Sequence, residues 1–419
     1  MYFTIINKIL KNSLLKNGAL FAFFSFLNSG INFLLLLVLV NFISPSEYGE
    51  LNLFNTFVTL LAIFVSLNAT GIIAVDFFST DKKHLCRMLN TVLCLSSVLF
   101  CFFSILLLLF SSFFESAIGL SIEYQWLGLL VCYTQVFSVI NLDIWRLEEK
   151  PISYGLYSVA TIVANFALTL VLVICFKQGW LGRLYAQVSV SSLFFFISIC
   201  FLRYRGYLVK ICPTKQSIKA ALGFGVPLIP HNASIWVRQG LDRYIINYFY
   251  LATQVGLYSF AYNFANIIQI IGLAFNATNS VYIYKNLAKK DEGVRTVLRH
   301  QTKMMIIFFT IITFLVCIGT VVFIPIWVPE YAGAIPYLIP LCISALFQCI
   351  YYLFVNYIFY FKKTKELMYI TFSLSLLHLI LSIILTRYSV MYTAYVTMFI
   401  NFVILLSVFL YSRRIYKLI

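Results

Sequence analysis

Apolar runs of about 20 residues, separated by short polar segments, follow one another along the whole chain. A helix rises about 1.5 Å per residue, so about 20 residues cross the hydrocarbon core of a membrane. Lipid offers no partner for backbone N–H and C=O groups, and such runs are therefore expected to be helical. The pattern predicts about twelve spans, at residues 18–42, 51–75, 88–110, 124–142, 152–176, 181–202, 221–249, 254–283, 303–325, 332–360, 367–386 and 389–411.

Polar residues recur on one face of several spans. Asn28 and Asn32 share a face of the first span, Asn55 belongs to a similar stripe in the second, and Asn266 and Gln269 share a face of the eighth. Polar groups facing lipid tails are unfavourable, so these faces are expected to meet other helices or a wet cavity. Interhelical hydrogen bonds explain any single residue, whereas the recurrence of the stripes favours a substrate cavity.

The seventh span holds Arg238, Asp242 and Arg243. An arginine near the bilayer centre is disfavoured by about 2.5–3.5 kcal/mol, so one without a role would be unusual. Arg238 and Asp242 are four residues apart and can pair along a helix, which leaves Arg243 without an acid at that spacing. A planar guanidinium donates two parallel hydrogen bonds to phosphate, and the arginines are therefore candidate substrate ligands. A structural Arg–Asp pair near the outer interface is the alternative.

Backbone breaks and ion coupling have separate signals. Pro227 and Pro230 remove backbone donors and predict a kinked or opened seventh span. Asp76, at the end of the second span, and His378, in the eleventh, are candidates for coupling to H+ or Na+. An ordinary interfacial position would also explain Asp76 and His231.

Composition agrees with a membrane protein and gives its orientation. The 419 residues are 62% hydrophobic and 11% charged, whereas a soluble domain carries about 25% charged residues. The net charge of +16 arises because 25 of the 30 basic residues lie before span 1, after span 12 and in every second loop between. Basic residues stay on the cytoplasmic side, so both termini are expected there, and nucleic-acid binding is not. This set contains Lys8, Lys11, Lys16, Lys82, Lys83, Arg87, Arg146, Lys150, Arg203, Arg205, Lys210, Lys215, Lys219, Lys285, Lys289, Lys290, Arg295, Arg299, Lys303, Lys362, Lys363, Lys365, Arg413, Arg414 and Lys417.

The two halves of the sequence repeat at an offset of 207 residues. Gly18 then falls on Gly225 and Gly49 on Gly256, while Asn32 coincides with Gln239. An offset that lays span 1 on span 7 keeps both halves in one orientation, which is a parallel repeat. We therefore expect an all-α integral membrane protein with two six-helix bundles, residues 1–210 and 211–419.

No enzyme or metal signature is present. The sequence has no P-loop, no nucleophile elbow and no metal-spaced set of ligands. Of the ten cysteines, eight lie inside predicted spans, and none forms a CxxC pair. Glu148 and Glu149 fit a solvated turn balanced by Arg146 and Lys150. We expect no catalytic residues, no metal and no cofactor.

Four short segments together resemble one family. Residues 43–51 (ISPSEYGEL), 223–230 (GFGVPLIP) and 242–246 (DRYII), followed by 255–259 (VGLYS), are similar to the signature of O-antigen flippases. These are the Wzx-type members of the multidrug/oligosaccharidyl-lipid/polysaccharide (MOP) exporter superfamily, and the resemblance implies a MOP/MATE-like fold. It also implies translocation of undecaprenyl-pyrophosphate-linked oligosaccharide repeat units from the cytoplasmic to the periplasmic leaflet, by alternating access about a cationic cavity.

The resemblance also implies the setting and the competitors. The partners would be the lipid-linked oligosaccharide, membrane lipids, an O-antigen polymerase and a chain-length regulator, in the bacterial inner membrane. An ion-coupled drug or solute antiporter of the same superfamily shares the topology but usually carries an intramembrane acid. A lipid II flippase generally has fourteen spans. An O-antigen polymerase typically exposes a long periplasmic loop, which this sequence lacks.

Overall fold

The structure is a computed structural model that describes residues 13–67, 69–79, 81–288 and 293–416. Every regular element in these ranges is a helix, as expected for a chain in lipid. Lys8, Lys11, Lys289, Lys290 and Lys417, which contribute to the predicted orientation, lie outside the described residues.

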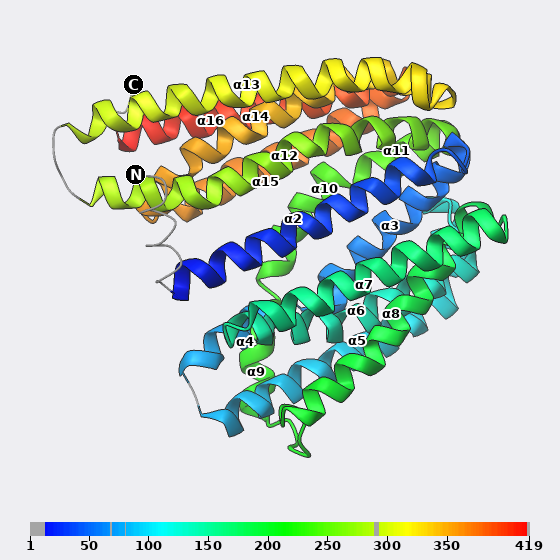
Figure 1. The fold of residues 1–419 in the computed structure, drawn as a ribbon, viewed down its shortest axis with the longest axis vertical. Coiled ribbons are helices and arrows are strands. Elements are labelled where there is room, and N and C mark those ends of the chain that lie inside the picture. The colour runs from blue at the N-terminus through cyan, green and yellow to red at the C-terminus, as the bar shows by residue number, and fades with distance from the viewer. Residues whose placement is uncertain (1–12, 68, 80, 289–292, 417–419) are drawn as a thin grey trace. The chain divides into compact units, whose positions relative to one another are not determined.

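Contacts divide the chain into a first unit, Met1–Ala233, and a second unit, Ser234–Ile419. The sequence suggested a division at residues 210 and 211, in the loop before α9 (Lys215–Gly225). However, α9 packs against α4 (Ala69–Ser79) and α5 (Lys82–Ile118) of the first unit (Figure 1). The Cβ of an alanine at Gly225 would lie 2.3 Å from the carbonyl oxygen of Leu67.

The first unit contains the elements up to the start of α10. They are α2 (Ser13–Leu39), α3 (Pro45–Val65), α4 (Ala69–Ser79), α5 (Lys82–Ile118), α6 (Ile122–Leu147), α7 (Pro151–Leu170) with a π-helical turn (Val171–Cys175), α8 (Gly179–Tyr204) and α9.

The second unit contains the remaining elements. They are α11 (Leu241–Phe249), α12 (Ala252–Leu287), α13 (Val294–Trp327), a 3-10 turn (Pro329–Ala334), α14 (Ile335–Tyr360), α15 (Thr364–Thr386) and α16 (Val390–Ile415), while α10 (Leu228–Gln239) crosses the division between the units.

Eleven helices in the described ranges are long and apolar enough to cross a membrane. The remaining predicted span, 221–249, is formed by α9, α10 and α11, with turns at Val226–Pro227 and at Gly240. The expected break at the prolines is confirmed. The second span was wrongly predicted as one helix over 51–75, because a turn at Ser66 and Leu67, where Leu67 has φ of 47°, separates α3 from α4.

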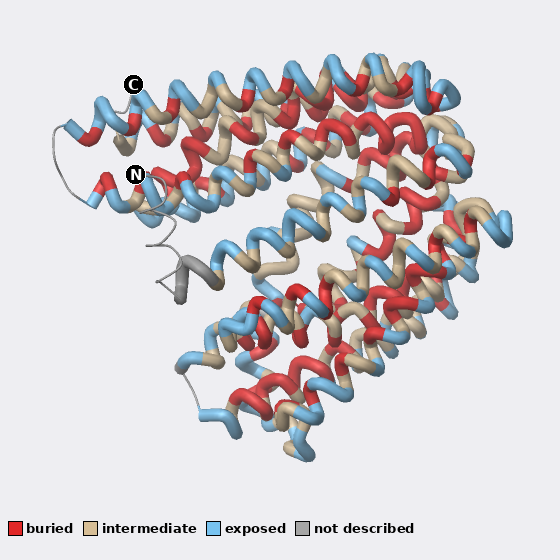
Figure 2. The backbone as a smooth tube through the Cα atoms, viewed as in Figure 1, coloured by how far each residue is buried: buried red, intermediate tan, exposed pale blue. Residues whose placement is uncertain are grey.

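The two units repeat the same helix packing, which confirms the parallel repeat. In the first unit α6 packs on α3 and α8, and in the second α14 packs on α12 and α16. Figure 2 shows α13 exposed along much of its length, and its counterpart α5 likewise has only a small buried share in its apolar part. The helix starts Pro45 and Ala252 are 207 residues apart, whereas Pro151 and Thr364 are 213 apart, because loop lengths differ between the units.

One turn fixes the repeat register for α7 and α15. Glu149 (φ 55°) and Lys362 (φ 58°) each stand two residues before the helix start. The next amide donates to equivalent carbonyls, Lys150 to Trp145 at 2.9 Å and Lys363 to Ile358 at 3.0 Å. Residues 213 apart in α7 and α15 therefore occupy equivalent positions.

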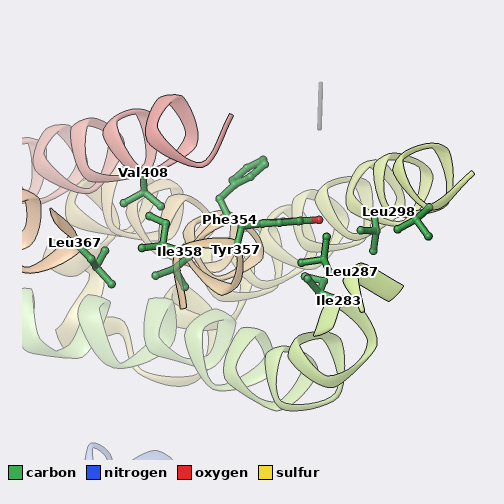
Figure 3. Packing of buried hydrophobic residues seen from close by; sticks show 10 residues of the cluster. Ile283, Leu287, Leu298, Phe354, Tyr357, Ile358, Leu367 and Val408 are labelled. Atoms are coloured by element: carbon green, nitrogen blue, oxygen red, sulfur yellow. The ribbon is translucent and has the colours of Figure 1, made fainter. Parts of the chain in front are cut away.

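The basic loops come together at one end of each unit. In the second unit Ile283, Leu298, Phe354 and Tyr357 form an apolar cluster at the ends of their helices (Figure 3). The Arg295 guanidinium lies 5.5 Å from the ring centre of Tyr416 at the same end. This arrangement agrees with the predicted alternation of charged loops.

In the first unit the equivalent end is held by Glu148, which was wrongly predicted to be a solvated turn residue. Its carboxylate lies 2.5 Å from Arg205 and 3.0 Å from Lys150, and it accepts a hydrogen bond of 2.6 Å from Tyr207. Burial alone would raise the pKa of Glu148, but these three partners outweigh it and lower the pKa from 4.5 to about 2. Arg205 also donates to Asn141, which joins α6 to the end of α8.

We predict that Gly272→Ala lowers the free energy of unfolding by about 1–3 kcal/mol, because a Cβ at Gly272 would lie 2.4 Å from Cys349 Sγ, where α12 meets α14. Gly319→Ala is the matched control. It meets nothing within 4 Å and should be neutral or stabilising by up to about 1 kcal/mol. Thermal unfolding of the purified proteins in detergent measures both. Equal melting temperatures for the two variants would contradict the close approach of α12 and α14.

We predict that the Glu148 network stabilises the fold above pH of about 4.5 and loses this contribution as the pH falls toward 2, because the folded-state pKa is depressed. Glu148→Gln should therefore lower the melting temperature at neutral pH and reduce its decline between about pH 5 and about pH 3. Glu149→Gln, at the exposed neighbour, is the control. An unchanged acid profile in Glu148→Gln would exclude the network as its source.

Candidate coupling and substrate-binding site in the second unit

The site begins at the break between α10 and α11. Gly240, with φ of −115° and ψ of −40°, separates the two helices, so Arg238 ends α10 while Asp242 and Arg243 open α11. The predicted pairing of Arg238 with Asp242 assumed one continuous helix. That prediction is wrong, because no ion pair joins these two side chains in the described residues.

Asp242 lies at the centre of a buried polar cluster, with an exposed fraction of 2%. Its Oδ2 accepts hydrogen bonds of 3.0 Å from both Tyr258 and Thr397, and its Oδ1 accepts one of 3.1 Å from Ser382. The Nε2 of His378 lies 3.6 Å from Oδ2. We call these five residues the Asp242 cluster; they come from α11, α12, α15 and α16.

Three neutral donors are enough to hold a carboxylate but leave its charge uncompensated. The one titratable cation within 4.0 Å of Asp242 in the described part of the chain is His378, whose Nδ1 has no hydrogen-bond partner there. The carboxylate and the imidazole therefore lie side by side in a part of the unit that is almost fully buried. The pair is a candidate for cation coupling.

The two arginines differ in how far the protein occupies their donors, and their predicted role in substrate binding stays a prediction. Arg243 donates from Nε to Ser259 at 3.1 Å and from Nη1 to the carbonyl of Gln239 at 2.5 Å. Its guanidinium also lies 4.9 Å from the ring centre of Tyr262, and it is 7% exposed. Arg243 is therefore occupied by the protein and holds α11 against α12.

Arg238 retains unused donor capacity. Its Nε is buried and has no hydrogen-bond partner in the described residues, and its electrostatic neighbours are the tyrosines Tyr351, Tyr262 and Tyr352. A guanidinium beside hydroxylated rings can receive phosphate and hydrogen-bond to sugar hydroxyls. Arg238 is the better candidate for an anionic substrate group.

The predicted polar stripes are placed unevenly. Asn266 and Gln269 are half-buried on α12, in the same unit as Arg238. In the first unit Asn55 is half-buried, Asn32 is exposed, and Asn28 has a buried Oδ1 without a partner in the described ranges. The role of all five in substrate binding stays a prediction.

The two residues suggested for ion coupling lie in different units of the chain. Asp76, in α4, lies 3.6 Å from His84 at the start of α5, beside the basic loop. His378 lies in the Asp242 cluster and is 1% exposed. His231 is exposed.

Sequence reasoning missed Tyr258, Ser382 and Thr397. Each is one of several hydroxyl residues in its span, and no sequence spacing links positions 242, 382 and 397. The available signal was that each is polar at membrane depth.

Comparison with known proteins gives one family and one fold. The profile of a family described as "Polysaccharide biosynthesis protein" matches residues 14–282. An uncharacterized membrane protein of Haemophilus influenzae is 25% identical over 379 residues, covering 88% of this chain and 89% of that protein. A protein of the Lsg locus of the same organism is 25% identical over 342 residues, covering 80% and 82%.

Solved structures share the fold at low identity. The lipid II flippase MurJ, in an inward closed conformation, superposes with a TM-score of 0.73 at 15% identity, covering 94% of this chain and 87% of that chain. An inward-facing multidrug resistance MATE family transporter of the MOP superfamily gives 0.72 at 17%, covering 93% and 95%. The predicted MOP-type fold is confirmed.

We predict that Arg243→Ala lowers the free energy of unfolding by about 1.5–3 kcal/mol, because it removes two charged hydrogen bonds and a ring contact. Arg238→Ala should cost less than about 0.5 kcal/mol, because the Arg238 Nε has no partner to lose. Thermal unfolding in detergent tests the pair. A larger loss for Arg238→Ala than for Arg243→Ala would reverse the assignment of roles.

Proposed function

The chain belongs to the polysaccharide biosynthesis protein family, and from this premise we propose that it is a flippase for a lipid-linked oligosaccharide. Transport rather than catalysis is proposed, without a bound cofactor. The observation that carries the proposal is Arg238, a membrane-embedded guanidinium with an unused donor beside tyrosines, in the same unit as a buried acid. The fold of the chain, which a lipid II flippase shares, also supports the proposal.

We further propose that the substrate is an undecaprenyl-pyrophosphate-linked O-antigen repeat unit, moved from the cytoplasmic to the periplasmic leaflet of a bacterial inner membrane by alternating access. Arg238 receives the pyrophosphate, and Asn266 and Gln269 bind sugar hydroxyls. The proposal places both termini in the cytoplasm, which the basic loops support. An O-antigen polymerase and a chain-length regulator are the expected protein partners.

In this proposal the Asp242 cluster couples transport to a cation. The imidazole of His378 beside the carboxylate favours H+ over Na+, because a hard alkali cation is best held by oxygen ligands alone. Uptake of the proton removes a buried negative charge and so changes the relative stability of the conformations.

The same cluster favours one second candidate, an ion-coupled antiporter of small solutes. An intramembrane acid is what such an antiporter requires, and Asp242 is far more buried than an interfacial residue. The two candidates differ in their cargo and hence in the role of Arg238. A flippase needs its guanidinium for the substrate phosphate, whereas an exporter of cationic solutes does not.

We predict that a strain without the protein displays no O-antigen, and that Arg238→Ala restores at most about one tenth of the wild-type level, as expected for loss of about 1.5–3 kcal/mol of charged hydrogen bonding. Arg238→Lys should restore an intermediate level. Arg146→Ala, whose side chain is 58% exposed and paired with Asp143, is the matched control.

The measurement is the O-antigen ladder on the cell surface, with membrane amounts of each variant matched by immunoblot. Surface O-antigen of single repeat units in the deletion strain would indicate a polymerase instead. Full display by Arg238→Ala would reject the proposed phosphate ligand, and normal polymerised display in the deletion strain would reject the flippase.

A further inference from the structure

A second buried charge cluster lies in the first unit, and the proposed function does not use it. Arg183, on the second turn of α8, donates from Nη1 to the Oδ1 of Asn165 and, at 3.1 Å, to the Oγ1 of Thr169. Both acceptors belong to α7. The described residues provide no carboxylate within 4.0 Å of this guanidinium, so a partly buried cation rests on neutral oxygens alone.

This cluster occupies the repeat-equivalent position of the Asp242 cluster. Asn165 and Thr169 of α7 are 213 residues before His378 and Ser382 of α15, and this is the register fixed by the turns that precede the two helices. The same two helix positions therefore carry polar ligands in both units.

The two clusters differ in the residue that carries the charge. At the offset of 207 residues that joins Pro45 to Ala252, the counterpart of Asp242 is Leu35, which is apolar and buried. At the offset of 211 that joins Gly179 to Val390, the counterpart of Arg183 is Ala394, one turn before Thr397. The first unit thus has a cation and no acid, whereas the second has an acid and no arginine in its cluster.

Local geometry positions the guanidinium. The π-helical turn Val171–Cys175 begins two residues after Thr169, and π-helical turns occur mostly at functional positions. Gly182 allows α8 to approach this turn, since a Cβ there would lie 3.0 Å from the carbonyl carbon of Leu172. The neighbouring Arg183 is thereby directed to α7.

We propose that Arg183 is a tethered cation, which permanently fills in the first unit the position that an exchangeable cation takes in the second. A covalently tethered charge has a fixed, high local concentration, so neutral oxygens can hold it and no carboxylate is needed to recruit it. An exchangeable cation needs the carboxylate of Asp242. Cation exchange is consequently confined to the second unit, an assignment that rests on the proposed coupling at Asp242.

The test removes the Arg183 side chain and supplies a free guanidinium ion in solution. Arg183→Ala is purified in detergent, and its melting temperature is measured with about 10 mM methylguanidinium or the neutral isostere methylurea. We expect methylguanidinium to restore at least half of the lost melting temperature and methylurea to restore little. Wild type and Arg146→Ala should not respond. Arg183→Lys, which keeps a tethered charge, should be more stable than Arg183→Ala without any additive.

The same experiment in an Asp242→Asn background separates this inference from the proposed function. Rescue should persist there, because the two clusters are distinct, even if the chain does not move a lipid-linked oligosaccharide. Wild-type stability of Arg183→Ala, or equal rescue by methylurea, would overturn the tethered cation. So would failure of both methylguanidinium and Arg183→Lys to improve on Arg183→Ala.

Discussion

The burial of one carboxylate constrains the second unit. Asp242 is removed from water by four helices and is held by three hydroxyl groups rather than by an arginine or lysine. Isolated charge in a low-dielectric interior is costly, and its cost falls when the group is protonated. The helices that supply Tyr258, Ser382 and Thr397 are thus tied to this carboxylate, and under the proposed function a change in its charge would alter their packing.

The two arginines near Asp242 differ in whether their donors have partners. Arg243 holds α11 to α12 through its hydrogen bonds. Arg238, on the other side of the Gly240 break, has a buried donor without a partner in the described residues. Under the proposed function, the second unit therefore offers one cationic group for a ligand and one acidic group for a proton. In the first unit the partly buried Arg183, which we assign to the equivalent cluster, is already held by Asn165 and Thr169.

Features that depend on neighbouring residues could be predicted from the sequence, whereas contacts between residues far apart in the sequence could not. Hydropathy and charge alternation depend on local composition, so most of the spans, the repeat and the fold class were predictable. The roles of Arg238 and Arg243 were not, because a spacing of four residues implies a shared face only if the helix is continuous, and the chain breaks at Gly240. His378 was found as an unusual residue in a span, but its contact with Asp242 joins positions 136 residues apart, which no local pattern reveals.

The most direct test of the account is the effect of a pH gradient on transbilayer movement of an undecaprenyl-pyrophosphate-linked oligosaccharide in proteoliposomes. The account predicts that the gradient accelerates movement by the wild-type protein and that Asp242→Asn moves the lipid at a rate independent of the gradient. Equal acceleration of wild type and Asp242→Asn would contradict it.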